Sequence, residues 1–186
     1  YGEEAIATPS DLFLARRRLV FHGAVQGVGF RPTAYRVASA LGLTGSVING
    51  PEGARVEVQG AAEAVARFAA TLREALSSLA RVDIVEESAV PPVLGELDFR
   101  VLPSELGARR SARVPPDAAL CPECRADMKE PDNPRYRYPF TTCTNCGPRF
   151  TLVHALPYDR ERTSMACFPL CPRCRGEYET PSDRRF

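Results

Sequence analysis

The sequence has no tryptophan, only two histidines, and a net charge of only +1 over 186 residues. So small a net charge provides no field that would draw the whole chain to nucleic acid or to an anionic membrane, and neither is indicated as a partner. No apolar run is long enough to span a membrane. Residues 1–15 carry acidic side chains and no basic-then-apolar pattern, which excludes a secretory signal, and we interpret them as a disordered leader.

Cysteine is the residue type used most selectively. Six of the seven cysteines form three Cys-x-x-Cys pairs. In a chain without a secretory signal this pattern indicates metal binding in a reducing compartment, the cytoplasm, and not disulfides. All three pairs lie in residues 120–186, called here the cysteine region, and we interpret residues 104–119 as a linker that precedes it.

Residues 16–103 carry the periodic patterns of a folded domain. The expected elements are a strand at Arg16–His22, a helix at Pro32–Leu41, strands at Thr44–Asn49 and Ala54–Gln59, a helix at Ala61–Leu79, a strand at Val82–Glu87 and a short last strand at Asp98–Leu102. This order predicts an α+β fold of the ferredoxin-like βαββαβ type, with an antiparallel sheet and both helices on one face.

A glycine-containing loop follows the first expected strand. Gly27 and Gly29 allow backbone N–H groups to converge, while Pro32 starts a helix whose positive end faces the same space. Arg31 adds a forked, permanently charged group, so the loop predicts a seat for a phosphate-sized anion. A plain glycine turn is the alternative; a dinucleotide fingerprint is disfavoured because Pro32 stands in place of its third glycine.

Asn49 ends the second expected strand. If it lies close to Arg31, its amide can hold a water in line with a phosphorus atom, while Arg31 and the loop amides stabilise the developing charge. The sequence does not establish that these two residues meet, because their contact depends on the strand order.

Two motifs carry a specific resemblance. Gly23-x-Val25-Gln26-Gly27-Val28-x-Phe30-Arg31 and Gly45-x-Val47-x-Asn49-x-x-x-Gly53 resemble the acylphosphatase family over residues 16–103. The resemblance implies that Arg31 and Asn49 are catalytic, with Asn49 orienting the attacking water, and that no metal, covalent intermediate or general base takes part. It also implies a phosphate site made by Val25, Gln26, Gly27, Val28, Gly29, Phe30 and Arg31.

The spacing of the first two cysteine pairs predicts zinc. Residues 125–142 separate the pair Cys121 and Cys124 from the pair Cys143 and Cys146, so two knuckles can place four thiolates around one ion. The third pair, Cys171 and Cys174, begins an internal repeat of period 50. Matching residues are Arg125 and Arg175, Pro131 and Pro181, Arg135 and Arg185, and Tyr136 and Phe186.

The repeat predicts a further pair near positions 193 and 196, so we interpret the second zinc unit as truncated and its site as incomplete. Sequential pairing makes Cys121, Cys124, Cys143 and Cys146 the complete site, and we favour it; nested pairing instead joins Cys143 and Cys146 to Cys171 and Cys174. Cys167 lies outside every pair. We interpret it as a small buried hydrophobic residue in preference to a metal ligand.

Aromatic residues alternate with arginines in the cysteine region. Arg135, Arg137 and Arg149 with Tyr136, Tyr138, Phe140 and Phe150 are compatible with a nucleic-acid surface. Residues 106–186 carry an excess of only four positive charges, so we favour aromatics that cap a small metal core and arginines that stay solvated.

Taken together, the two parts resemble the hydrogenase maturation carbamoyltransferase family, HypF. Thr141-x-Cys143-x-x-Cys146-Gly147-Pro148-Arg149-Phe150 and Pro157-Tyr158-Asp159-Arg160-x-Arg162-Thr163-x-Met165 resemble its zinc region. The resemblance implies release of carbamate from carbamoyl phosphate, followed in further domains by transfer of the carbamoyl group to a partner, HypE, for the cyanide ligands of nickel–iron hydrogenase. A zinc-dependent binding or scaffold module with a non-catalytic anion loop is the alternative.

Overall fold

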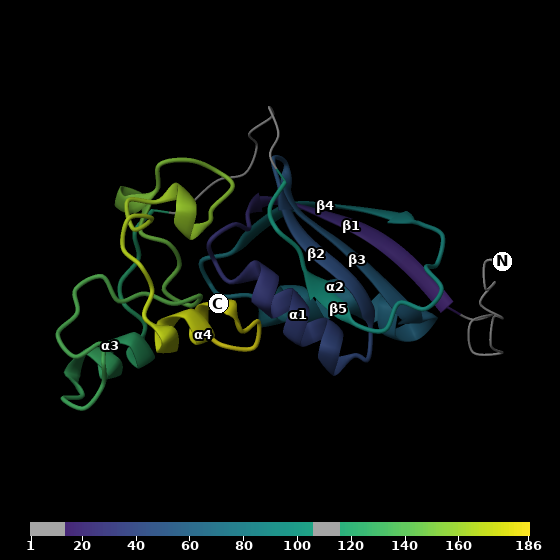
Figure 1. The fold of residues 1–186 in the computed structure, drawn as a ribbon. Helices are drawn as coiled ribbons and strands as arrows, with labels where there is room; N and C mark the ends of the chain where they lie inside the picture. The colour runs from purple at the N-terminus through teal and green to yellow at the C-terminus, as the bar shows by residue number, and fades with distance from the viewer. Residues whose placement is uncertain (1–13, 106–115) are drawn as a thin grey trace, which may run out of the picture.

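The computed structural model describes residues 14–105 and 116–186 (Figure 1). The expected leader therefore lies outside the described residues except for its last two positions, and so does most of the expected linker. None of the helices within these two ranges has both the length and the apolar character that a membrane crossing requires.

A five-stranded sheet forms the larger part of the molecule. Its strands are β1 (Leu14–Ala24), β2 (Thr44–Gly50), β3 (Gly53–Ala61), β4 (Arg81–Ala89) and β5 (Phe99–Val101). They lie in the order β4-β1-β3-β2-β5, with α1 (Phe30–Ala40) and α2 (Ala62–Ala75) packed against each other and against the same sheet. The succession of the first six elements confirms the expected ferredoxin-like fold.

The sheet is mixed, so the expectation of a wholly antiparallel sheet is wrong at one edge. β5 pairs with β2 in parallel, at Gly45↔Phe99 and Val47↔Val101. The cause is the connection after β4, which crosses from one edge strand of the sheet to the other before β5 begins. Parallel neighbours need such a crossover, whereas the β2–β3 pair needs only a tight turn.

The core lies between the sheet and the two helices. Phe21 of β1, Val56 of β3 and Phe68 of α2 are all fully buried in it. α2 ends at Ala75, four residues before the predicted end, because Leu76 adopts an extended backbone with ψ 148°. Leu79, expected on the apolar face of that helix, instead lies against Gly147 of the cysteine region.

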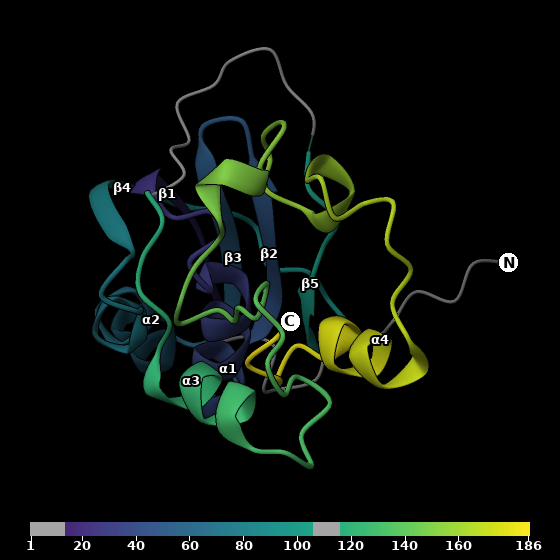
Figure 2. The same ribbon diagram turned by 90° about the vertical axis from the view of Figure 1, so that its left-hand side faces the viewer.

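The cysteine region lies beside the end of the sheet where β1 leads into α1 (Figures 1 and 2). It contains α3 (Pro122–Lys129), α4 (Pro172–Glu179) and two 3-10 turns, η2 (Phe150–Leu152) and η3 (Arg160–Arg162). Helices α3 and α4 start at matching positions of the two repeats, and the cysteine before each has nearly the same backbone, φ −65° with ψ 160° and 161°. The sequence repeat is thus also a structural repeat.

Candidate functional site

Asn49 and the loop after β1 lie at the same edge of the sheet. β3 separates β1 from β2, and Ala54 of β3 pairs with Phe21 on one side and Asn49 on the other. Both flanking strands run antiparallel to β3, so they run in the same direction and end at the same edge. The two strands are not neighbours, yet their ends bring the predicted site residues to one corner of the molecule.

The anion loop, residues 25–30, turns its side chains into the core. Val25, Val28 and Phe30 are at most 2% exposed. Gly27 and Gly29 have φ of +73° and +75°, a left-handed conformation that residues with a Cβ adopt at a cost. No backbone N–H from Gln26 to Gly29 donates a hydrogen bond to another described residue. The loop therefore offers donors beside the positive N-terminus of α1, as an anion requires.

The side chain of Gln26 fastens the anion loop to its surroundings. Its Nε2 donates to the carbonyls of Gly50, at 2.8 Å, and Gly53, at 3.1 Å. Its Oε1 accepts from the N–H of Tyr158 at 3.2 Å. The sequence assigned Gln26 only a backbone contribution, but the buried amide connects the loop to both the β2–β3 turn and the cysteine region.

Asn49 is 1% exposed, and its Oδ1 has no hydrogen-bond partner among the described residues. A buried carbonyl oxygen without a partner is costly, so a ligand or water that donates a hydrogen bond to it would bind more favourably. The backbone carbonyl of Asn49 accepts from the N–H of Glu105 at 2.8 Å, which brings the segment after β5 into the same corner.

Arg31 extends to two parts of the chain that are distant in sequence. One terminal nitrogen donates to Ser104 Oγ at 3.3 Å. The other donates to Asp159 Oδ1 at 2.9 Å and lies 3.5 Å from the carbonyl oxygen of Tyr158. Because Ser104 adjoins Glu105, which bonds Asn49, a single short segment links the two predicted catalytic residues.

The cysteine region packs directly against the anion loop. A Cβ added to Gly27 would lie 2.8 Å from Pro148 Cγ and 3.1 Å from Tyr158 Cδ1. A Cβ on Gly29 would lie 2.6 Å from Thr144 Cβ. These contacts join residues more than a hundred positions apart, so local sequence patterns carry no signal for them.

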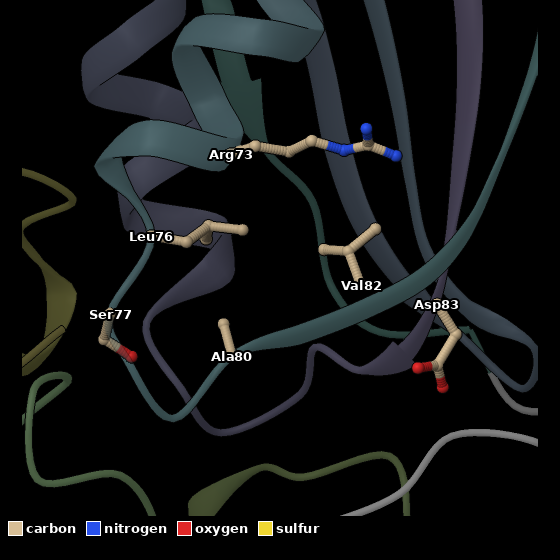
Figure 3. Close-up of a pocket in the computed structure, with 6 residues that line it drawn as sticks. All are labelled: Arg73, Leu76, Ser77, Ala80, Val82 and Asp83. Atoms are coloured by element: carbon tan, nitrogen blue, oxygen red, sulfur yellow. The ribbon is translucent and has the colours of Figure 1, made fainter.

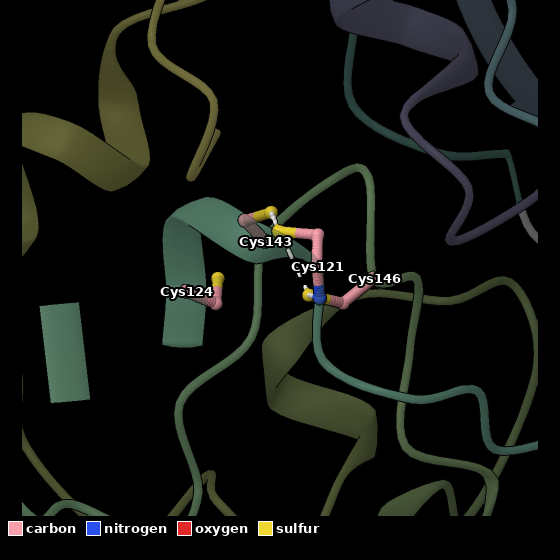
Figure 4. Close-up of side chains that lie close together, drawn as sticks. All are labelled: Cys121, Cys124, Cys143 and Cys146. Atoms are coloured by element: carbon pink, nitrogen blue, oxygen red, sulfur yellow. Dashed lines mark hydrogen bonds between the residues drawn. The ribbon is translucent and has the colours of Figure 1, made fainter. Parts of the chain in front are cut away.

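Four cysteines form a compact cluster (Figure 4). The sulfurs of Cys121, Cys124, Cys143 and Cys146 all lie within 4.8 Å of one another. Cys143 Sγ is 3.6 Å from Cys121 Sγ and 3.8 Å from Cys146 Sγ. Tetrahedral coordination with zinc–sulfur bonds of about 2.3 Å places sulfurs about 3.8 Å apart, so the donor set fits one zinc ion. This grouping is the one that sequential pairing requires.

The environment distinguishes the thiols of this cluster. Burial raises the pKa of Cys143, but N–H bonds from Cys146 and Asn145 outweigh it and bring the value to about 7. Burial raises the pKa of Cys124 to about 11. A metal ion would favour the thiolate form of all four side chains, with proton release on binding.

The remaining cysteines are not part of the cluster. Cys171 and Cys174 lie at the start of α4, outside the four-cysteine group, and each is at least partly exposed. Cys167 is exposed, so its interpretation as a buried hydrophobe is wrong; its sulfur bonds the Ser164 carbonyl at 3.5 Å.

An arginine from each of the two repeats contacts the helix of the other repeat. Arg135 of the first repeat pairs with Glu177 and reaches Cys174 Sγ at 3.7 Å. Its counterpart in the second repeat, Arg185, pairs with Asp127 and reaches Cys124 Sγ at 3.8 Å. Each arginine therefore braces the helix of the other repeat, and the expectation that the arginines stay solvated is wrong for Arg135, whose side chain is 13% exposed.

The expected aromatic cap on the metal core is also wrong. Tyr136, Tyr138, Phe140 and Phe150 are between 41% and 58% exposed. The cluster is covered instead by Leu120 and by the arginines that reach its sulfurs.

A separate pocket lies behind the anion loop (Figure 3). Its Ser77 donates to the Val28 carbonyl at 3.1 Å. The lining residues are Arg73, Leu76, Ser77, Ala80, Val82 and Asp83. None of them is a predicted site residue, so the corner formed by Arg31, Asn49 and the anion loop remains the candidate site.

Comparison with known proteins bears on both parts of the chain. Residues 17–101 match the acylphosphatase family model, and residues 120–153 match the HypF finger model. Acylphosphatase of Nitrobacter hamburgensis is 41% identical over 91 residues, which are 48% of this chain and 87% of that protein.

Longer matches extend across both parts. Carbamoyltransferase HypF of Rhodobacter capsulatus is 48% identical over 171 residues, 91% of this chain but 22% of that protein. A crystal structure of full-length HypF in a phosphate- and nucleotide-bound form superposes with a TM-score of 0.84 at 40% identity, covering 93% of this chain and 23% of the other. The chain thus spans about a fifth of the length of these carbamoyltransferases.

Proposed function

The chain belongs to the acylphosphatase family through residues 17–101, and on this premise we propose that it hydrolyses carbamoyl phosphate, an acyl phosphate, to carbamate and inorganic phosphate. It is also homologous to HypF carbamoyltransferases over most of its length. The observation that carries the proposal is the convergence in one corner of Arg31, Asn49 and loop amides that have no partner within residues 14–105 and 116–186.

Each residue of this corner has a role in the reaction. The loop amides and Arg31 bind the phosphoryl oxygens and stabilise the charge that they gain in the transition state. Asn49 Oδ1 accepts a hydrogen bond from a water and aims its oxygen at phosphorus. The new oxygen–phosphorus bond forms as the bond to the acyl oxygen breaks, and the electron pair leaves with carbamate. The water's proton passes to solvent, so no protein base is needed.

The cysteine cluster has a structural role, and not a catalytic one, in this proposed function. Zinc, held by Cys121, Cys124, Cys143 and Cys146, would be coordinated by four thiolates and would stabilise the fold of the region without an open position for substrate. Thr144 lies within one of its knuckles and lies against the anion loop, so the cysteines on either side of it, when they hold a metal, would help to fix that wall of the site.

In the complete protein, we propose, the carbamate goes on to the carbamoyl transfer that HypF carbamoyltransferases are named for, with HypE as the acceptor and hydrogenase maturation as the process. This chain covers 22% of the Rhodobacter capsulatus relative. Only the hydrolytic step is assigned to the residues described here.

The test is phosphate release from carbamoyl phosphate and acetyl phosphate by the zinc-loaded chain and its variants. Arg31→Ala and Asn49→Ala should each lower kcat/KM by about 100-fold or more, the usual effect of removing a group that stabilises a transition state. Arg36→Ala is the matched control, because Arg36 lies on the same helix, is exposed and, among the described residues, bonds only Thr33.

Equal activity of all four proteins would refute the assignment of the site. Turnover of neither substrate, with phosphate binding that Arg31→Ala abolishes, would instead favour the alternative of a non-catalytic anion loop on a zinc-dependent module.

A further inference from the structure

The segment Tyr158-Asp159 places two hydrogen-bond acceptors beside Arg31 that hydrolysis of an acyl phosphate does not need. Both acceptors contact the same terminal nitrogen of Arg31, the Asp159 carboxylate at 2.9 Å and the Tyr158 carbonyl at 3.5 Å. Residues 158 and 159 lie outside the acylphosphatase match at 17–101, so this wall is an addition to that domain.

Contacts with the anion loop hold the segment Tyr158-Asp159 in place. The N–H of Tyr158 bonds Gln26 Oε1, and its ring packs over Gly27. The Asp159 side chain is 27% exposed and the Arg31 side chain 20% exposed. The carboxylate is therefore held at the rim of the anion loop, partly shielded from water, and is not a surface group that happens to reach inward.

A carboxylate in this place disfavours phosphate ligands in general. Any phosphate that binds Arg31 comes close to a second negative charge, and the repulsion acts on all of them alike. A phosphate also competes with the carboxylate for the Arg31 nitrogen that donates to it. Only a ligand that donates a hydrogen bond to the carboxylate recovers part of this cost, because a half-buried acceptor that loses its donor is unfavourable. The acceptor therefore distinguishes ligands by the donors that they carry.

Shape alone cannot make this distinction for acyl phosphates. The amino group of a carbamoyl group and the methyl group of an acetyl group are nearly the same size, but only the amino group donates hydrogen bonds. A site that bonds a substrate N–H rejects the analogue that lacks it far more strongly than a site that senses size. An acceptor next to the phosphate seat is the feature that such selection requires.

We propose that Asp159, supported by the Tyr158 carbonyl, is a specificity-determining residue that accepts a hydrogen bond from the amino group of a carbamoyl phosphate. The inference rests on the proposed function and adds to it the group that recognises the acyl end of the substrate. The acylphosphatase fold supplies the phosphate site, and the cysteine region supplies the selectivity.

The test compares two stable phosphonates that differ at one group. Phosphonoacetamide carries the amino group and acetonylphosphonate carries a methyl in its place. Calorimetric titration of the zinc-loaded chain should give about tenfold tighter binding of phosphonoacetamide, the lower end of the range for a hydrogen bond to a charged group at a partly exposed site. In Asp159→Leu, which keeps the branch at Cγ but has no acceptor, the ratio of the two affinities should fall to near one.

Two further variants define the origin of the effect. Asp159→Asn retains an acceptor oxygen without the charge and should keep a measurable preference for phosphonoacetamide. Glu161→Gln removes one negative charge two residues further along, at an exposed position, and should leave the ratio unchanged. Circular dichroism of each variant checks that the fold is retained.

The proposal is overturned if the chain binds both phosphonates equally, or if Asp159→Leu strengthens both by the same factor, since the carboxylate would then be only an internal competitor of phosphate. Binding does not depend on turnover, so the two ideas can fail separately. Hydrolysis of carbamoyl and acetyl phosphates with equal kcat/KM would keep the function and refute the selectivity. An Asp159-dependent preference without any hydrolysis would support the selectivity and refute the proposed hydrolytic function.

Discussion

Gly29→Ala should destabilise the chain by about 2 to 5 kcal/mol through two separable effects. Gly29 has φ +75° and ψ 18°, a left-handed backbone that costs a residue with a Cβ about 1 to 2 kcal/mol. The new methyl would also lie 2.6 Å from Thr144 Cβ. Overpacking of this kind costs about 1 to 3 kcal/mol more.

A double-mutant cycle separates the two effects. Thr144→Gly removes the Cβ and its methyl, two of the three atoms nearest to the added methyl, and leaves the third, the Thr144 backbone carbonyl oxygen, at 3.3 Å. In the double variant the steric cost should disappear while the backbone cost remains. The coupling free energy should therefore be about 1 to 3 kcal/mol in the relieving direction, well above the roughly 0.3 to 0.5 kcal/mol scatter of independent sites.

The measurement is urea unfolding of the four proteins, followed by circular dichroism at a fixed zinc concentration, because bound metal adds to apparent stability. Additive losses, or a loss below about 1 kcal/mol for Gly29→Ala alone, would show that Thr144 does not touch the loop in solution. That result would refute the packing of the cysteine region on the anion loop, and with it the position assigned to Asp159.

Three further predictions address the metal and the ion pairs. Arg185→Gln, which removes one of the two arginines that pair with Asp127, should lower the zinc affinity of the four-cysteine cluster by about 10-fold or more in a chelator competition, as loss of groups that orient metal ligands usually does. Cys171→Ser should leave that affinity within about twofold, since Cys171 lies outside the cluster, and a larger loss would indicate nested pairing. Burial alone would raise the pKa of Glu57, but bonds from Arg16 and Arg18 lower it below its ordinary value. Glu57→Gln should therefore cost about 2 kcal/mol at pH 7, a difference that shrinks as acid protonates the native carboxylate, and equal losses at pH 7 and pH 3 would contradict the pairing.

Local patterns in the sequence predicted the elements but not all of their partners. Alternation and glycine placement predicted the ends of β1, β2 and β3 to within two residues. Successive side chains of a strand point to opposite faces, so a half-buried strand can be recognised from neighbouring residues alone. The parallel pairing of β5 was missed, since it depends on a crossover and not on the three residues of the strand. Leu79 fits a helical stripe by spacing, but α2 ends at Ala75 and Leu79 lies against Gly147.

In the candidate site, too, residue types were predicted from the sequence but the contacts between distant segments were not. Arg31 and Asn49 were predicted as site residues from motifs, because their residue types and spacing reflect the chemistry directly. Asp159 was noted only as part of a family motif, and its contact with Arg31 joins residues 128 positions apart. The period-50 repeat did match Arg135 with Arg185, yet the exchange between repeats follows from how α3 and α4 face each other, which sequence similarity does not determine.

The exchange of arginines between the repeats has a consequence for the order in which the protein is made. The fourth cysteine of the cluster, Cys146, leaves the ribosome before Arg185, and the whole of 147–184 is synthesised between them. At about 5 to 20 residues per second, about 2 to 8 s pass between Cys146 and Arg185, which pairs with Asp127, and a metal ion could bind the four cysteines in that time. During that interval the sulfurs are more open to solvent than in the finished fold. The second repeat would thus close over a site that has already had time to bind metal.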